Sequence, residues 1–199
     1  WLEDPPYNWQ PIAKGKGLGF TSPALTKDVV IAGSSSVDLW LKSSARDTDL
    51  QATLTEVRPD GQETYVQSGW LRASHRKLDK KASTVSNPFP THFKKDAAPL
   101  PKGKFSLVRI PVFAAAHAFR AGSKLRITVS AVGGDRAIWH FATLDKGNAK
   151  NTILLGGKKP SRIVLPVLAG ADAQGTPLPE AAALRGQPTR AYAAASNGG

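Results

Sequence analysis

Residues 36–76 read SVDLWLKSSARDTDLQATLTEVRPDGQETYVQSGWLRASHR, and this stretch predicts the fold. Apolar side chains alternate with polar ones at 37–41 and again at 50–54, which is the period of strands with one buried face. The tetrapeptide RPDG at 58–61 favours a tight turn, because proline presets the first corner and glycine accepts a left-handed conformation. Residues 62–71 supply the partner strand. The stretch therefore predicts a long antiparallel hairpin.

Further strand signals lie on both sides of this hairpin. We expect additional short strands at residues 18–22, 29–32, 105–113, 125–131, 138–142, 152–155 and 162–168. The run GSSS at 33–36 is predicted to be a turn and 114–119 a single helical turn, while Pro111 indicates an edge strand or a strand end. About eight or nine short strands separated by turns, without a long helix, indicate a β-sandwich or jelly roll.

The composition divides the chain into three parts. Residues 1–17 contain prolines and glycines and are predicted to be an arm or linker. Residues 18–168 are predicted to form the sandwich, and 169–199, rich in Ala, Gly and Pro, an extended tail that wraps the domain or meets a partner. Inside the sandwich, residues 77–104 carry four prolines and seven lysines. Loops of that length are uncommon in compact domains and tend to be functional or to cover something.

The charge and the cysteine content exclude several classes of function. The chain of 199 residues has 27 basic and 15 acidic side chains, a net charge of +12, and no cysteine. Disulfides and thiolate metal sites are excluded, and the compartment is left open. We interpret the charge as a solvated basic surface and expect no nucleic-acid partner. No apolar run is long enough to span a membrane. Because the chain begins at Trp1, we expect a fragment of a larger protein.

The sequence contains no recognisable catalytic constellation. A serine hydrolase needs a nucleophile on a sharp turn, a histidine base and an orienting carboxylate, but the pattern Gly-x-Ser-x-Gly does not occur. The nearest run, at 33–36, lacks the second glycine. The four histidines have no zinc-binding spacing. We therefore expect no catalytic residue, cofactor or metal ligand in this chain.

Two aspartates lie at the start of the second strand of the hairpin region. Asp47 and Asp49 precede apolar residues, so at least one carboxylate should be half-buried and need partners. Arg72, Arg76 or Arg120 could supply bidentate hydrogen bonds, and we predict a structural Asp–Arg network that holds the ends of the hairpin. The alternative is a calcium site, for which two aspartates are a small ligand set.

Four aromatic residues are candidates for contact with another domain. Trp1 and Trp9 give the arm a large aromatic area, which either packs back on this domain or forms a seam with a missing one. Trp139 and Phe141 follow a glycine pair and either line the rim of a pocket or cap the core from one face of a strand. The second of these two interpretations is favoured for Trp139 and Phe141.

The motifs of this chain resemble a known family. They read ARDTDL (45–50), VRPDG (57–61), GWLRASHR (69–76), HAFRAGSKLRI (117–127) and PSRIVLP (160–166). In this order they are similar to the C-terminal β-sandwich domain of the X-Pro dipeptidyl-peptidase and cocaine-esterase (CocE/NonD) family of serine hydrolases. The resemblance covers roughly residues 18–168. It implies an all-β jelly-roll sandwich, like galactose-binding domains, and no catalytic role for this domain.

The resemblance also implies a partner and a setting. An α/β-hydrolase domain of the same parent protein would carry the triad and cleave an ester or amide bond, including that of an X-Pro dipeptide. This domain would then support the hydrolase fold, wall its substrate pocket or make subunit contacts in a homo-oligomer. Two rival classes stay open: a free-standing module that binds carbohydrate or a polyanion, and a self-contained hydrolase. The first predicts affinity for glycans or heparin that falls with salt.

Overall fold

The structure is a computed structural model that describes residues 9–135, 142, 144–176 and 187–194. The strands of this described part are β1 (Gly17–Thr21), β2 (Val29–Ser43), β3 (Asp49–Val57), β4 (Gln62–Arg72), β5 (Ser106–Phe119), β6 (Lys124–Ser130), β7 (Asn151–Ile153), β8 (Arg162–Val164) and β9 (Thr189–Ala191). Its helices are the short 3₁₀ turns η1 (Ala73–His75), η2 (Lys94–Asp96) and η3 (Leu144–Gly147). None of the helices found there has the length and apolar content to cross a membrane.

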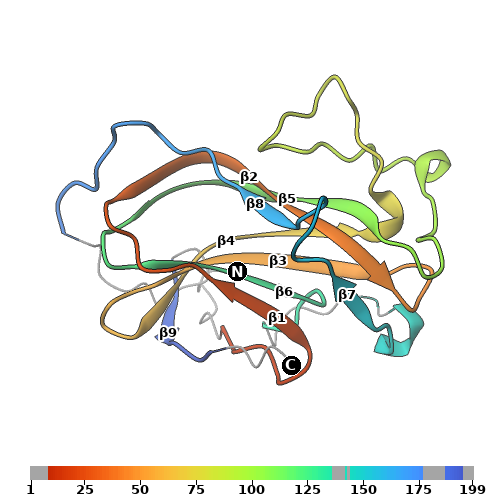
Figure 1. Cartoon of the computed structure of the whole chain (residues 1–199), viewed down its shortest axis with the longest axis horizontal. Helices are drawn as coiled ribbons and strands as arrows, with labels where there is room; N and C mark the ends of the chain where they lie inside the picture. The colour runs from red at the N-terminus through yellow and green to blue at the C-terminus, as the bar shows by residue number, and fades with distance from the viewer. Residues whose placement is uncertain (1–8, 136–141, 143, 177–186, 195–199) are drawn as a thin grey trace, which may run out of the picture.

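The strands form two antiparallel sheets that face each other (Figure 1). One sheet has the order β1-β6-β3-β4-β9, and the other has β5-β2-β7 with β8 also paired to β2. The predicted hairpin is β3 and β4, joined at 58–61, where Gly61 has a φ of 80°. The prediction of an all-β sandwich is thereby confirmed. The closer likeness to galactose-binding domains stays a prediction.

The core lies between the two sheets and follows the predicted alternation. The strands β2, β3 and β5 contribute every second side chain to it over much of their length, as half-buried strands should. The main cluster contains Val37, Leu39, Leu41, Leu50, Ala52, Leu71, Ala73, Leu100, Val108, Ile110, Val112 and Val129. A second cluster at one end of the sandwich contains Ile31, Leu54, Val66 and Phe119. The contiguous apolar interior is what makes the two sheets one folding unit.

Two local predictions were wrong. Residues 33–36 are not a turn, because β2 continues through them with a bulge between Gly33 and Ser35. Residues 114–119 are not a helical turn, because they extend β5 and pair with the first residues of β2. In both places the ladder between the two strands satisfies the backbone hydrogen bonds that a turn would otherwise have to satisfy locally. The prediction from Pro111 was right, since β5 is an edge strand.

The outer face of the five-stranded sheet is also partly buried, and the side chains buried there are polar. Gln51, Thr53 and Thr55 of β3 point away from the apolar core and are nevertheless buried. The described part of the N-terminal segment lies beside this face, where the Gln10 N–H donates to the carbonyl of Asp135 at 2.9 Å. The described residues 187–194 add β9 to the edge of the sheet. The described residues near both ends of the chain therefore pack on the sandwich, while an extended tail at 169–199 stays a prediction.

Candidate functional site: an anchored loop at the hairpin end

The open end of the hairpin carries one of the predicted ion pairs. Asp49 and Arg72 face each other in the β3–β4 register. Arg72 Nε donates to Asp49 Oδ1 at 2.8 Å and Arg72 Nη2 donates to Oδ2 at 2.9 Å. This planar, bidentate geometry is the one in which guanidinium binds carboxylate best. The hydrogen bond that Arg72 donates to Asp49 is the main cause that raises the pKa of Arg72.

The other predicted members of the network have backbone partners. Asp47 Oδ1 accepts from the N–H groups of Thr48 at 3.0 Å and Ser74 at 2.8 Å, beside the Asp49–Arg72 pair. Arg76 donates to the backbone carbonyls of Ala73, Ala98 and Pro99. Arg120 lies elsewhere and donates to the carbonyls of Gln174 and Gly175 at 3.3 and 2.8 Å. In the described ranges no group of three or more His, Cys, Asp or Glu side chains could hold a metal ion.

Trp9 packs against its own domain. Its side chain is 6% exposed, and its ring meets Tyr65 edge to face with 5.8 Å between centroids. The guanidinium carbon of Arg190 lies 3.5 Å from the centre of the Trp9 ring, which is a close cation–π contact. A side chain this buried has little surface left for a neighbour. Trp1, Trp139 and Phe141, the other rim candidates, lie outside the described residues.

The long connection at 77–104 is firmly tied to the sandwich. Arg76 holds its far end through the carbonyls of Ala98 and Pro99, and the Leu100 N–H donates to the carbonyl of Arg46 at 2.7 Å. Leu100 itself is part of the core. Across the middle of the loop, Leu78 and Pro90 form an isolated β-bridge. A loop that is hydrogen-bonded in this way has a defined shape, although it contains only one short helical turn, η2.

A second anchor ties residues 84 and 85 of the loop to the four-stranded sheet. Arg109 of β5 donates through Nη2 to the carbonyls of Thr84 and Val85 and through Nε to Asp38 Oδ1 at 2.9 Å. Asp38 of β2 is buried and also accepts from Arg162 Nε at 3.3 Å. Arg109 thus holds the loop and also pairs with the buried carboxylate of Asp38.

This anchored loop exposes apolar side chains. Val85, Phe89 and Phe93 are 65%, 53% and 60% exposed, although side chains of this size are usually buried. In Figure 1 the loop, drawn in yellow and green, projects away from the strands beside β5. Several large apolar groups on a rigid, projecting element are typical of a surface that another protein covers. We call residues 77–104 with these three side chains the apolar loop.

The described residues include one histidine–carboxylate pair, and its arrangement is that of a structural contact and not of a catalytic triad. His117 Nε2 is 2.8 Å from Glu56 Oε2, and Gln187 Nε2 lies 3.0 Å from His117 Nδ1. The Ser123 hydroxyl bonds the same Glu56 carboxylate, not the imidazole, so the order of a nucleophile, base and acid is not met. Burial raises the pKa of Glu56, but the hydrogen bonds from His117 and Ser123 outweigh it and hold that pKa below 4.5.

One group of polar residues was missed by the sequence interpretation. Glu63 is 0% exposed and accepts from Arg126 Nη1 at 2.9 Å and from Arg190 Nε and Nη2 at 3.1 and 3.0 Å. The three residues come from β4, β6 and β9, and no spacing in the sequence connects them. The only signal in the sequence was that Glu63 is a charged residue near the start of a predicted strand.

Comparison with known proteins places the chain in a family. Residues 4–164 match the X-Pro dipeptidyl-peptidase C-terminal non-catalytic domain. A Mycobacterium bovis protein provisionally named as a serine esterase is 29% identical over 155 residues, which is 77% of this chain and 24% of that protein. The cocaine esterase of a Rhodococcus species is 28% identical over 162 residues, 76% of this chain and 25% of the enzyme.

A solved structure shows the same fold. A CocE/NonD family hydrolase from Staphylococcus aureus superposes with a TM-score of 0.61 and 23% identity, over 76% of this chain and 30% of that one. The fold is that of a β-sandwich domain, and the matched family is described as a non-catalytic C-terminal domain. The chain belongs to the X-Pro dipeptidyl-peptidase C-terminal domain family. It spans about a quarter of the length of the two curated relatives described above.

Proposed function

We propose that this domain docks through the apolar loop on the α/β-hydrolase domain of a serine hydrolase that cleaves esters or amides. The observation that carries the proposal is the set of exposed side chains Val85, Phe89 and Phe93 on a loop that is anchored at Val85 and at its far end. Relatives in which the matching part is about a quarter of the chain, one of them named cocaine esterase, supply the chemistry of the partner. The domain itself would position and stabilise the wall of the substrate pocket.

The first test is the reading frame that encodes this chain. A Gly-x-Ser-x-Gly elbow followed by an aspartate and a histidine is expected upstream of Trp1, in the order of an α/β-hydrolase. A frame without these residues would overturn the proposed parent activity. X-Pro dipeptides and simple esters are the substrates to compare in the encoded protein.

The second test addresses the docking surface. In the protein encoded by that frame, the double substitution Phe89→Ser and Phe93→Ser should lower ester turnover or the melting temperature of the hydrolase part, because apolar area would return to water. The melting temperature of this domain alone should stay unchanged, since both rings are exposed in it. Leu155→Ser is the control, because Leu155 is 60% exposed and lies outside the loop. If the double substitution and Leu155→Ser changed turnover and melting temperature equally, the apolar loop would not be the docking surface.

A further inference from the structure

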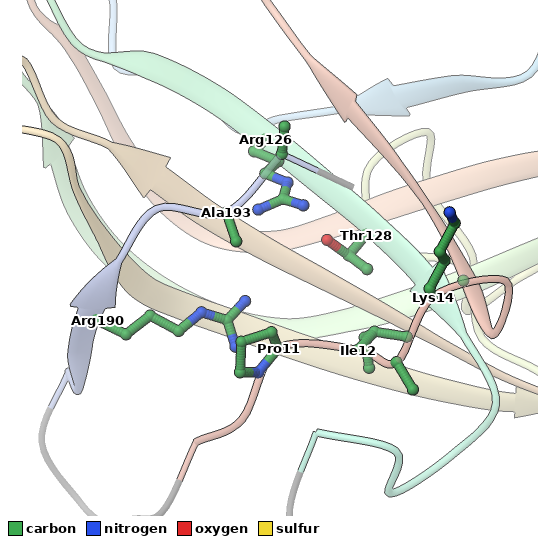
Figure 2. A pocket seen from close by; sticks show the side chains of 10 residues that line it. Pro11, Ile12, Lys14, Arg126, Thr128, Arg190 and Ala193 are labelled. Carbon is green, nitrogen blue, oxygen red and sulfur yellow. The ribbon is translucent and has the colours of Figure 1, made fainter. Parts of the chain in front are cut away.

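A small pocket lies on the outer face of the five-stranded sheet, next to the Glu63 cluster (Figure 2). It has a volume of about 150 Å³ and is lined by residues of both chain ends and of β6. Arg126 and Thr128 are two residues apart on β6, so both side chains lie on the outer face. Figure 2 shows the guanidinium groups of Arg126 and Arg190 directed toward one another, with the Thr128 hydroxyl turned to the same space.

The pocket holds more positive than negative charge in direct contact. Arg126 and Arg190 share the single carboxylate of Glu63, which also accepts from Thr55 Oγ1 at 2.8 Å. Lys14 adds a further cation to the lining. Burial is the main cause that lowers the pKa of Arg190, with Arg126 lowering it further and Glu63 and Asp135 opposing.

The carboxylate of Asp135 offsets part of this positive charge. This buried carboxylate accepts from Gln51 Nε2 through both oxygens, at 3.0 and 3.1 Å. The carboxylate of Glu63 forms ion pairs with both guanidinium groups.

Three buried polar atoms of the lining have no hydrogen-bond partner: Arg126 Nε, Arg190 Nη1 and Thr128 Oγ1. A buried donor without a partner destabilises the folded state, so three such atoms around one pocket are unusual in a folded domain. The guanidinium nitrogens can only donate, and the hydroxyl can donate as well. The group that satisfies all three must therefore bring acceptor oxygens, and the two arginines favour one that carries negative charge.

The size and the walls narrow the class of ligand. A water molecule needs about 10–15 Å³ of such a volume, so the pocket has room for roughly ten water molecules or for a small organic ligand. Pro11, Ile12 and Ala193 form apolar walls around the polar end. These walls suit a short hydrocarbon group better than a fully hydrated phosphate.

We propose that this pocket binds a small monocarboxylate, a use that goes beyond the function proposed above. The carboxylate oxygens accept from Arg190 Nη1, Arg126 Nε and Thr128 Oγ1. The short apolar part of the acid lies against Pro11, Ile12 and Ala193. Lys14 at the rim contributes attraction at longer range. Glu63 keeps both guanidinium groups in place, so the site is formed before the ligand arrives.

The test uses the side-chain NMR signals of the arginines in the whole chain. Sodium acetate and sodium butyrate are titrated at constant ionic strength against sodium chloride, and the Nε–H resonances of Arg126 and Arg190 are followed. We expect a saturable shift with a Kd on the order of 1 mM, the affinity that a ligand of so few atoms can reach. Chloride should produce no saturable shift. A flat titration with both acids, or saturation by inorganic phosphate alone, would overturn the proposal.

Substitutions separate the site from the fold. Thr128→Val removes a hydroxyl that has no partner, so the melting temperature should stay the same or rise while affinity falls about fivefold or more. Lys14→Gln should weaken binding about twofold, and Lys124→Gln, the same change on the exposed start of β6, should leave it unchanged. Undiminished affinity in Thr128→Val would contradict the assignment of the hydroxyl. This result does not depend on hydrolase activity, so it can fail independently of the proposed function.

Discussion

Glu56 illustrates how a buried carboxylate couples the stability of this domain to pH. The hydrogen bonds from His117 and Ser123 outweigh the cost of burial, so the pKa of Glu56 in the folded state lies below its ordinary 4.5. A carboxyl group with a depressed pKa stabilises the folded state above its unfolded pKa, and this contribution disappears as pH falls through the folded value. Glu56 is therefore expected to contribute fully near pH 7 and not at all in strong acid.

The substitution Glu56→Gln tests this coupling. The variant should be less stable than the parent near pH 7, and the difference should shrink as the pH is lowered below about 4.5, where the unfolded carboxyl group takes up its proton. Urea unfolding between pH 7 and pH 3 measures it. Asp60→Asn, at an exposed turn, is the control and should change little. A difference that is constant over this range would show that Glu56 acts through packing alone.

At the scale of elements, β4 and β5 of the two sheets approach each other closely at Gly69. A Cβ atom added to Gly69 would lie 1.8 Å from the carbonyl oxygen of Pro111 and 2.8 Å from the Cα of Val112. These are backbone atoms, so the clash cannot be relieved by turning a side chain. Gly69 thus lets the hairpin approach the edge strand closely.

The substitution Gly69→Ala should therefore destabilise the domain by at least about 1–3 kcal/mol, the usual cost of forcing extra volume into a packed interior. A fall in the midpoint of urea unfolding, with little change in slope, is the expected result. Gly156→Ala is the matched control, because a Cβ at Gly156 would meet no atom within 4 Å and its φ is not in the left-handed region. Comparable loss in both variants would mean that the close approach to Pro111 is not the cause.

The same strands show how far the sequence predicts this fold. The hairpin was predictable because alternation and turn chemistry are local and agree with each other. The continuity of β2 through 33–36 and of β5 through 114–119 was not, because small residues there favour turns or helix until pairing between the two strands decides otherwise. Residue by residue, Asp49 and Arg72 could be proposed as partners from the register of the hairpin. Glu63 and Arg190 could not, because their contact depends on where the end of the chain returns.

At the scale of the whole molecule, residues 9–14 and 187–194 cover the outer face of the five-stranded sheet. The polar outer face of β3 is buried although its alternating pattern suggested a solvated face. Trp9 from one end stacks on Arg190 from the other, and Arg190 in turn binds Glu63. The sandwich and its ends are therefore coupled through a buried carboxylate, and they should unfold together.

Shortening the chain tests this coupling. A chain that ends at Gln187 loses β9 and the Arg190 partner of Glu63, which leaves a buried carboxylate with one guanidinium fewer. Breaking a buried ion pair costs about 3–5 kcal/mol, so the midpoint of urea unfolding should fall sharply or the domain should not fold. A chain that ends at Ala194 keeps β9 and should unfold like the parent. If both shortened chains matched the parent, the cover would contribute nothing to folding, and the stability of the sandwich would come from the apolar core alone.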